Sequence, residues 1–304
     1  MKEFEFIRLL EKDFNQDNLI GDDAALIYNN ILISKDILVE NIHFLKSTPL
    51  EYVIHKLFTS NISDIASMGG TSKYVFLGIA ADNEKILEEL TPFIKRECEK
   101  YNVILAGGDT TSSKNGLFLS LTVVGEKGKN VIKRNGAKEG DIIFLSRNVG
   151  KCRISLEKEL GIHNFKIDKY YHYNKNAEYK LGSLLSSCDA VTAMTDVSDG
   201  VSVDLLNIAE SSNKKAVIEY DKLNIDYLKE YNVDYLDYFL SSGEEFALLF
   251  TVEKSQATYL KKNIYDNLKI SIYEIGRIEH GEGLYLEKDR QMQRISSSGY
   301  QHFK

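Results

Sequence analysis

The chain of 304 residues contains no tryptophan, two prolines and three cysteines. Cys98, Cys152 and Cys188 are widely spaced and form no CxxC pair, which argues against a disulfide framework. We expect them to be small core residues of a protein in a reducing compartment. The first residues lack the apolar core of a signal peptide, and no apolar run approaches the ~20 residues of a membrane-spanning helix. These absences predict a cytoplasmic protein with no membrane partner.

Positive charge is also scarce. The chain has 38 Lys and Arg against 45 Asp and Glu, a net charge of -7. A general nucleic-acid binder needs a basic face, so no nucleic-acid partner is expected. A nucleotide substrate remains compatible with this charge, because Mg²⁺ screens carboxylates from phosphates. The composition, 43% hydrophobic and 27% charged, is typical of a globular protein.

The common nucleotide-binding and hydrolase motifs are missing as well. There is no G-x-x-x-x-G-K-[ST] pattern, since Gly150-Lys151 is followed by Cys152, and no G-x-G-x-x-G opens a helix after a strand. The folds that use these loops therefore lose support. No G-x-S-x-G elbow or H-E-x-x-H motif occurs either. Six scattered histidines and three scattered cysteines do not favour a zinc site.

What the chain does contain is a series of carboxylates among small residues, mostly at strand ends and in loops. The aspartates of this series that we single out are Asp23, Asp36, Asp64, Asp109, Asp196 and Asp199. Taken alone, each is most often a turn former or a helix cap, and Asp199 with Ser198 is well placed as a cap. Several follow apolar strands, where α/β folds bind ligands. If they converge, their mutual repulsion requires cations, and Mg²⁺ with bridged phosphates is the natural choice.

Strand and helix patterns alternate through both halves, which predicts an α/β fold with two domains, residues 1–138 and 139–304. Expected helices cover 3–14, 49–67, 84–101, 151–160, 177–187, 202–211 and a stretch ending near 265. Expected strands cover 24–28, 31–34, 74–81, 103–106, 117–125, 142–146, 190–195, 216–220, 246–252, 268–275 and 283–286. The polar segment 163–173 is expected to be a loop. Pro92 is expected to kink or split its helix.

These motifs together resemble the thiamine-monophosphate kinases of bacteria, in order from about Gly21 to Tyr300. The matching segments are Gly21-Asp22-Asp23-Ala24, Ser34-Lys35-Asp36, Glu40-Asn41-Ile42-His43-Phe44, Asn61-Ile62-Ser63-Asp64-Ile65-Ala66, Gly107-Gly108-Asp109-Thr110-Thr111, residues 134–141, Asp196-Val197-Ser198-Asp199-Gly200 and Ser242-Gly243-Glu244-Glu245-Phe246. That family belongs to an ATP-binding superfamily with aminoimidazole ribonucleotide synthetase, selenophosphate synthetase and a hydrogenase maturation factor. The segment containing His43 favours the thiamine enzymes. The N-terminal cysteine often found in selenophosphate synthetases and the C-terminal cysteine of the hydrogenase factor are both absent here.

The resemblance implies that ATP phosphorylates thiamine monophosphate to thiamine diphosphate. It implies an aminoimidazole ribonucleotide synthetase-like fold, with an N-terminal mixed sheet that pairs two subunits into a homodimer and a C-terminal α/β domain. Several Mg²⁺ ions would be held by Asp23, Ser34, Asp36, Asp64, Asp109, Asp196 and Asp199. ATP would contact Gly108, Asp109, Arg134 and Ser198, and the thiamine end would contact His43, Glu244 and Tyr300. Asp36, Asp64, Asp109 and Arg134 would carry catalysis.

Three residues depart from the pattern of this family. Lys35 stands beside a metal ligand where Thr is usual, and an ammonium does not coordinate Mg²⁺; we hypothesise that Lys35 either points away or replaces one cation. Ser242 and Glu245 stand where Gly and Asp are usual, near the expected substrate end. Two alternatives stay open: another ATP-dependent enzyme of the same superfamily, or a paralogue that binds thiamine phosphates without turnover.

Overall fold

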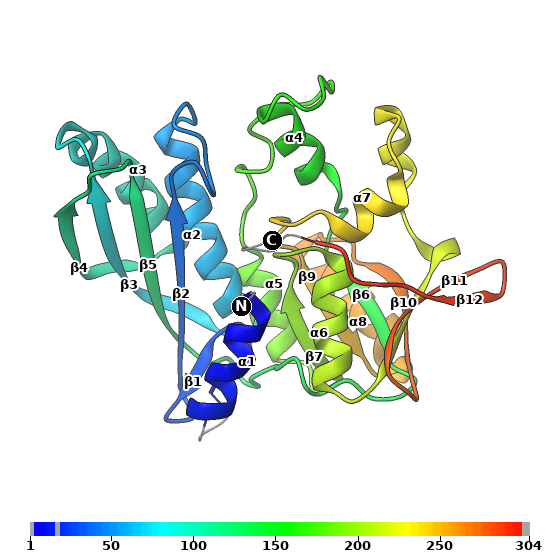
Figure 1. The fold of residues 1–304 in the computed structure, drawn as a ribbon. Coiled ribbons are helices and arrows are strands. Elements are labelled where there is room, and N and C mark those ends of the chain that lie inside the picture. The colour runs from blue at the N-terminus through cyan, green and yellow to red at the C-terminus, as the bar shows by residue number, and fades with distance from the viewer. Residues whose placement is uncertain (1–2, 16–18, 300–304) are drawn as a thin grey trace.

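The computed structural model describes residues 3–15 and 19–299. Two sheets stand side by side, each with its own helices (Figure 1). The first has the order β1-β2-β5-β3-β4 and the second the order β12-β11-β8-β10-β6-β9-β7. This confirms the predicted α/β fold with two domains.

The bounds of the elements follow the predicted alternation. The strands are β1 Ala25–Ile27, β2 Ile31–Val39, β3 Thr71–Ala81, β4 Ile104–Ser112, β5 Phe118–Glu126, β6 Ile142–Leu145, β7 Val191–Asp196, β8 Lys215–Glu219, β9 Leu248–Val252, β10 Tyr273–Glu279, β11 Gly283–Lys288 and β12 Gln291–Arg294. The helices are α1 Glu3–Phe14, α2 Leu50–Ser67, α3 Lys85–Tyr101, α4 Lys151–Glu159, α5 Tyr179–Ser186, α6 Val201–Ser211, α7 Tyr235–Ser241 and α8 Ala257–Leu268. Short 3-10 turns lie at Tyr220–Lys222, Asp226–Tyr231 and Lys254–Gln256.

Several elements differ from the sequence prediction. Strand β2 continues through Asp36 to Val39, and β4 continues through the Gly-Gly-Asp segment. Helix α7 and strand β12 were not predicted, and β10 begins and ends later than expected. Helix α3 passes Pro92 without a break in the helix. The segment 163–173 contains turns but neither helix nor strand, as predicted.

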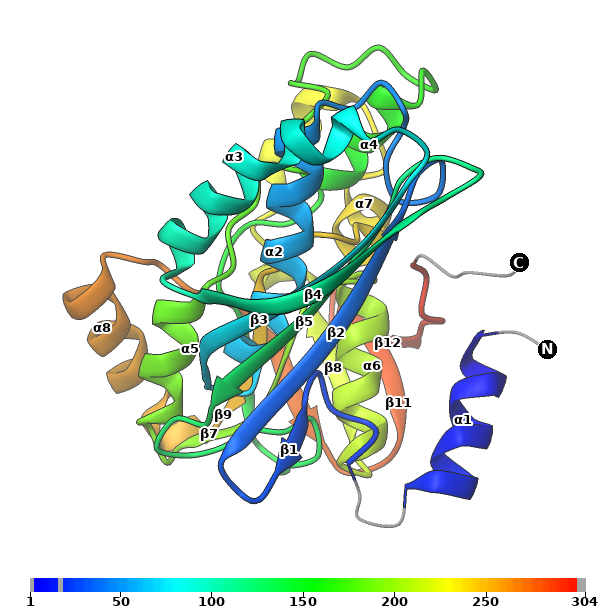
Figure 2. The same ribbon diagram turned by 90° about the vertical axis from the view of Figure 1, so that its left-hand side faces the viewer.

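In the first domain, α2 and α3 pack on one face of the sheet, and Figure 2 shows both helices on the same side of the strands. Alternation along the strands buries Leu121 and Val75 against these helices. The opposite face carries Ile37, Tyr74 and Phe76, which remain 53%, 46% and 42% exposed. This face of the sheet is therefore open to solvent and exposes several large apolar side chains.

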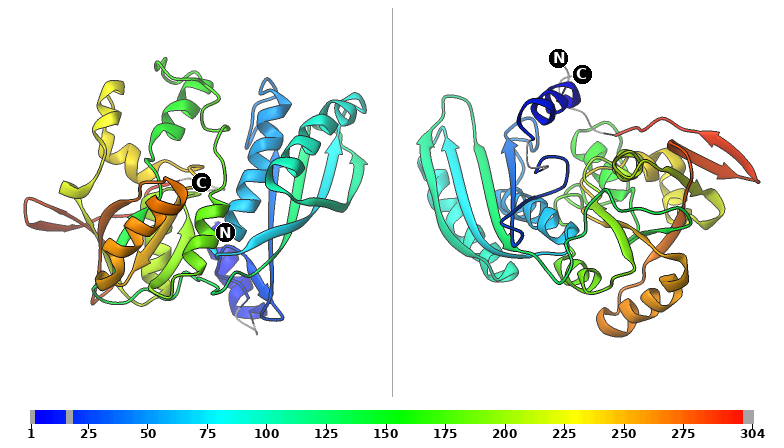
Figure 3. Two further views of the ribbon diagram at one scale, coloured as in Figure 1. Left: turned by 180° about the vertical axis from the view of Figure 1, so that it is seen from behind. Right: turned by 90° about the horizontal axis from the view of Figure 1, so that it is seen from below.

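The two domains meet along α2, which packs against α5 of the second domain (Figure 3). Tyr173 and Ala177 of the second half are buried in the core of the first domain. The connection between β5 and β6 spans 127–141, and the predicted boundary at residue 138 lies within it. That boundary stays a prediction.

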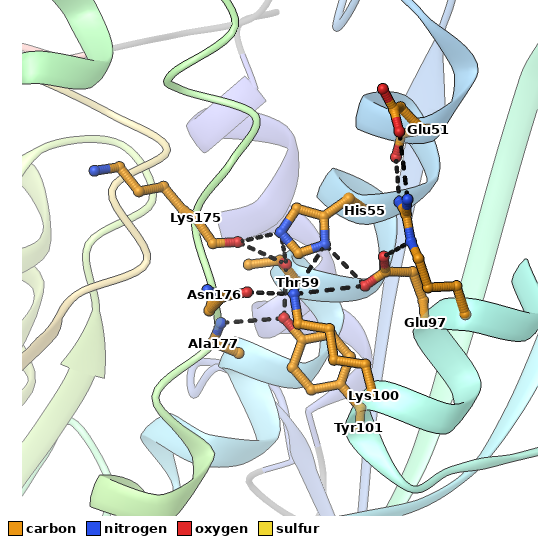
Figure 4. Close-up of polar contacts among 10 residues, drawn as sticks. Glu51, His55, Thr59, Glu97, Lys100, Tyr101, Lys175, Asn176 and Ala177 are labelled. Atoms are coloured by element: carbon orange, nitrogen blue, oxygen red, sulfur yellow. Dashed lines mark hydrogen bonds and ion pairs between the residues drawn. The ribbon is translucent and has the colours of Figure 1, made fainter. Parts of the chain in front are cut away.

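A buried polar network around His55 also joins the domains (Figure 4). One ring nitrogen of His55 lies 2.8 Å from Glu97 Oε2 on α3, and the other lies 2.7 Å from the carbonyl oxygen of Lys175. The Thr59 hydroxyl donates to the same carbonyl at 3.0 Å, and Tyr101 Oη lies 2.9 Å from Thr59 Oγ1. The network fixes the chain near Lys175 against both helices of the first domain.

Two further expectations concern the cell compartment. The three cysteines are free thiols. Within residues 3–15 and 19–299, the helices are too short or too polar to span a bilayer. The cytoplasmic location stays a prediction.

Candidate functional site

Four of the predicted aspartates gather where the domains meet: Asp23 before β1, Asp36 on β2, Asp64 on α2 and Asp196 at the end of β7. We call these four residues the acidic cluster. Burial raises the pKa of Asp64 well above its usual value, and the charges of Asp36, Asp196 and Asp23 raise it further. Burial and the charge of Asp23 likewise raise the pKa of Asp196. These four carboxylates are therefore close enough to repel one another.

One face of α2 forms the floor of this site. Ser60, Ser63, Asp64 and Ser67 follow Lys56 at positions that return to the same side of a helix. Ser63 Oγ donates to Asp196 Oδ2 at 2.5 Å, and Ser67 Oγ donates to Asp23 Oδ2 at 2.5 Å. The small hydroxyl residues of this stretch therefore hold carboxylates that come from other segments.

Arg134 supplies a fixed positive charge to the acidic cluster. Its guanidinium forms an ion pair with Asp23, and its Nε donates to Thr195 Oγ1 at 3.3 Å. Its backbone N–H donates to Asp22 Oδ1 at 3.0 Å. Burial alone would lower the pKa of Arg134, but the charges of Asp23, Asp204 and Asp196 together outweigh it and raise the pKa. Arg134 is thus a permanent cation, held in one orientation by the first domain and by β7.

The three consecutive residues Ser34, Lys35 and Asp36 divide between the two faces of β2. Ser34 is buried and its hydroxyl donates to the Asn61 carbonyl at 3.1 Å, while the Asp36 amide donates to Asn61 Oδ1 at 3.1 Å. Lys35 lies on the other face, where its Nζ donates to Ser120 Oγ at 2.7 Å. Of the two hypotheses for Lys35, the structure supports the one in which it points away from the metal ligands.

Ser198 and Asp199 lie in the turn between β7 and α6, together with a carboxylate that the sequence analysis missed. Asp204 in the first turn of α6 accepts hydrogen bonds from the amides of Ser198, Asp199 and Gly200 at 3.1, 3.2 and 3.1 Å. Asp204 therefore shapes the turn, with its side chain buried at 1% exposure. The sequence signal that could have identified Asp204 was its position in the first turn of a predicted helix, four residues after Gly200.

The expected substrate end brings His43 and Glu244 together through a residue not predicted from the sequence. Lys56 on α2 forms an ion pair with Glu244 and donates to the carbonyl oxygen of His43 at 2.8 Å. The Nδ1 atom of His43 accepts the Val39 amide at 3.0 Å, which orients the ring. We call His43, Lys56 and Glu244 the acceptor end. Tyr300, also predicted there, lies outside the described residues.

Ser242 and Glu245, the two departures near Glu244, turn instead toward α4. Glu245 Oε1 accepts the amides of Gly150 and Cys152 at 2.6 and 3.2 Å, and the Ser242 hydroxyl at 2.7 Å. Ser242 Oγ in turn accepts the amide of Arg153 at 3.0 Å. These side chains satisfy the free amides at the start of α4, so they support the loop that carries Glu244.

Gly108 and Asp109 are not brought to the acidic cluster within one chain. They lie on β4, an edge strand that is exposed along its whole length. In the sheet, Asp36 is opposite Leu121, Leu121 is opposite Leu77, and Leu77 is opposite Gly108. Asp36 and Gly108 are therefore three strand spacings apart, which is about 14 Å. A Cβ at Gly108 would lie 2.0 Å from the Leu77 oxygen, which explains the glycine.

The donor set of the acidic cluster suits Mg²⁺, because it consists of carboxylate and hydroxyl oxygens. Among the side chains that the structure describes, no three His, Cys, Asp or Glu residues form a ready-made metal site. Mg²⁺ at nucleotide sites usually takes one or two carboxylates together with phosphate oxygens and water. The arrangement therefore fits an ion that arrives with a phosphorylated ligand.

Comparison with known proteins gives full-length relatives. Residues 21–126 match the family of AIR synthase related protein, N-terminal domain, and residues 138–289 match its C-terminal domain. The chain is 34% identical to the thiamine-monophosphate kinase of Buchnera aphidicola subsp. Acyrthosiphon pisum, with 98% of this chain and 96% of that protein covered. For the thiamine-monophosphate kinase of Pyrococcus horikoshii the identity is 30%, with 100% and 97% covered. A solved structure of AaThiL complexed with AMPPCP and TMP gives a TM-score of 0.86 at 28% identity, covering 99% and 97% of the two chains.

Proposed function

Because this chain belongs to the thiamine-monophosphate kinase family, within the AIR synthase related proteins, we propose that it transfers the γ-phosphoryl group of ATP to thiamine monophosphate. The products are thiamine diphosphate and ADP. The observation that carries the proposal is the acidic cluster at the junction of the domains, with the partly buried cation Arg134 fixed beside it. AMPPCP and TMP in the related AaThiL structure supply a ligand pair of the matching chemistry.

For this reaction the protein mainly has to position the two substrates and neutralise their negative charge. The acceptor is a phosphate oxygen that is already ionised near neutral pH, so neither a strong general base nor a protein nucleophile is required. The difficulty is to bring two polyanions together, and positioning with electrostatic stabilisation supplies most of the rate in phosphoryl transfer. Arg134 is suited to this task because its planar guanidinium keeps its charge and donates in two directions.

Within this proposal, Asp36, Asp64 and Asp196 hold Mg²⁺, with Ser34 and Asp199 as further oxygen donors. Mg²⁺ bound with the nucleotide supplies charge neutralisation at the transferred phosphoryl group. Asp23 would be a further Mg²⁺ ligand, and its carboxylate also orients Arg134 through their ion pair.

At the acceptor end, His43 and Glu244 would contact thiamine monophosphate. Burial alone would raise the pKa of Glu244, but Lys56 and neighbouring histidines outweigh it and lower the pKa. A carboxylate that stays ionised is suited to the cationic thiazolium ring of thiamine. Tyr300, Ser198 and Gly108 remain proposed contacts, the first with thiamine and the other two with ATP.

We also propose a homodimer formed by the open face of the first sheet. Ile37, Tyr74 and Phe76 expose apolar surface there, and β4 leaves an unpaired edge. Monomeric proteins seldom leave such a long edge strand uncovered. Light scattering on the purified chain should give twice the monomer mass, and Phe76→Glu should give a monomer. A wild-type monomer at micromolar concentration would reject the dimer.

In that dimer, Asp109 would serve the nucleotide of the partner subunit, because it lies about 14 Å from Asp36 in its own chain. Asp109→Asn and Asp64→Asn chains would then each be inactive alone. Their co-refolded mixture should recover about a quarter of wild-type activity, because half of the dimers are mixed and each has one intact site. No recovery in mixed dimers would place Asp109 in its own subunit's site.

The test of the reaction is ADP release from MgATP with thiamine monophosphate, against thiamine and no-acceptor controls. We expect release that depends on the monophosphate, with thiamine diphosphate formed in equal amount. ADP release without thiamine diphosphate would indicate another ATP-dependent enzyme of the superfamily. Binding of thiamine monophosphate with no ADP at any Mg²⁺ concentration would indicate a non-catalytic paralogue.

A further inference from the structure

Lys56 is a buried lysine in the middle of α2 whose side chain reaches across to the second domain. It is 4% exposed. Its ammonium forms an ion pair with Glu244, donates to the carbonyl oxygen of His43 at 2.8 Å and lies 5.2 Å from the centroid of the Tyr173 ring. These three partners come from three separate segments of the chain. A buried lysine held this way differs from a solvated helix lysine, whose long side chain normally reaches water.

The cost of burying an ammonium makes this arrangement informative. Taking the charge of Lys56 out of water is unfavourable unless a close carboxylate and further hydrogen bonds compensate it. Glu244 provides the carboxylate, His43 an acceptor and Tyr173 an aromatic face. A methionine of similar length would fill the same volume without that cost, so the charge itself points to a role.

The position of Lys56 relative to the acidic cluster suggests that role. On α2, Lys56 precedes Asp64 by eight residues, which is about 12 Å along the helix axis and on the same face. Lys56 therefore stands between the carboxylates of the acidic cluster and the residues expected to contact thiamine.

We propose that Lys56 is a positioning residue of the acceptor end: its ammonium fixes Glu244 of the second domain beside the His43 turn of the first. This inference rests on the proposed kinase function and adds a residue to its substrate recognition. Because the ammonium bridges the two domains, the acceptor end has its binding geometry only when the domains are packed as observed. ATP, expected at the acidic cluster, does not depend on this contact.

The experiment compares Lys56→Met and Lys56→Arg with the wild-type enzyme. We expect Lys56→Met to raise the KM for thiamine monophosphate by about tenfold or more, since it removes the buried partner of the ion pair that holds Glu244. The KM for MgATP should stay within about twofold, a change that corresponds to less than 0.5 kcal/mol of binding free energy. Lys56→Arg keeps the charge and should recover part of the affinity. Lys95→Met, on the exposed face of α3, is the matched control.

Glu244→Gln provides the second arm of the test. If Lys56 acts through Glu244, the double variant Lys56→Met/Glu244→Gln should bind thiamine monophosphate no more weakly than the poorer single variant. Calorimetric titration of thiamine monophosphate without ATP measures this coupling independently of turnover. Thermal melting of every variant identifies any that has lost its fold, and Lys56→Arg then carries the comparison.

The outcomes separate this inference from the proposed function. A wild-type enzyme that makes no thiamine diphosphate overturns the function. An active wild type with an unchanged acceptor KM in Lys56→Met overturns the role of Lys56 alone. Equal increases in both KM values, or effects that multiply in the double variant, would likewise reject positioning of Glu244 by Lys56.

Discussion

The Nε2 atom of His55 lies 2.7 Å from the main-chain oxygen of Lys175, so a buried side chain of α2 holds a segment of the second domain. The Nδ1 atom of the same ring lies 2.8 Å from Glu97 Oε2 on α3. Lys175 in turn places its ammonium 3.8 Å from Glu245. The network therefore links α3 to the loop that carries Glu244.

Replacing Glu97 by Gln should destabilise the protein by about 1–3 kcal/mol at pH 7, because His55 and Arg96 lose a charged hydrogen-bond partner. Burial alone would raise the pKa of Glu97, but hydrogen bonds and charges from His55, Lys100 and Arg96 together outweigh it, and the pKa is lowered in the folded state. A lowered pKa stabilises the fold above the unfolded value of about 4.3. That contribution is lost as the pH falls through the folded pKa. Urea midpoints should therefore differ at pH 7 and converge below about pH 4.

The control for this variant is Glu99→Gln on the same helix, where the carboxylate is 68% exposed and pairs with Lys95. Exposed pairs of this kind contribute about 0.5 kcal/mol or less. A Glu97→Gln protein as stable as Glu99→Gln at pH 7 would contradict a stabilising role for the His55 network.

Lys35→Thr should leave the Mg²⁺ concentration for half-maximal activity unchanged. Lys35 faces Ser120 and Thr122 on the open face of the first sheet, whereas Ser34 and Asp36 face α2. Asp36→Asn is the positive control and should shift the Mg²⁺ titration to higher concentration. A shift in Lys35→Thr as large as that control would show that Lys35 does replace a cation.

Arg134→Lys should lower kcat by about 10²-fold or more, the usual effect of removing a preorganised donor from a transition-state site. Lysine keeps the charge but cannot form the ion pair with Asp23 and the hydrogen bond to Thr195 at the same time. Steady-state kinetics of ADP release measures the change. Lys133→Met removes the neighbouring, more exposed cation paired with Asp22, and equal losses in both variants would indicate a general charge effect.

Glu245→Asp should lower the stability of the protein by about 1 kcal/mol, which is typical of losing the hydrogen bonds that satisfy a helix N-terminus. The shorter side chain does not reach the amides of Gly150 and Cys152 from the present backbone position. Thermal melting detects the loss, and Glu253→Asp at an exposed ion pair is the control. An unchanged melting temperature would show that the start of α4 finds other acceptors.

Local patterns in the sequence determined most of the elements of this protein. The helical recurrence of Val53, Leu57 and Phe58 identified α2, and the fold class follows from alternating strands and helices. The pattern of carboxylates among small residues singled out six aspartates, and the structure brings four of them together. These signals are short in range, because periodicity, caps and turns depend on residues a few positions apart.

Only the tertiary structure decided which of these residues meet. Arg134 and Asp23 are 111 residues apart in the sequence. In the sequence Lys56 has the pattern of an ordinary helix lysine, and only the packing of the second domain places Glu244 beside it. The same packing leaves Asp109 on a distant edge strand, although its motif looks like the others. The charge state and partner of a side chain depend on burial and on contacts between domains, and neither is encoded in local spacing.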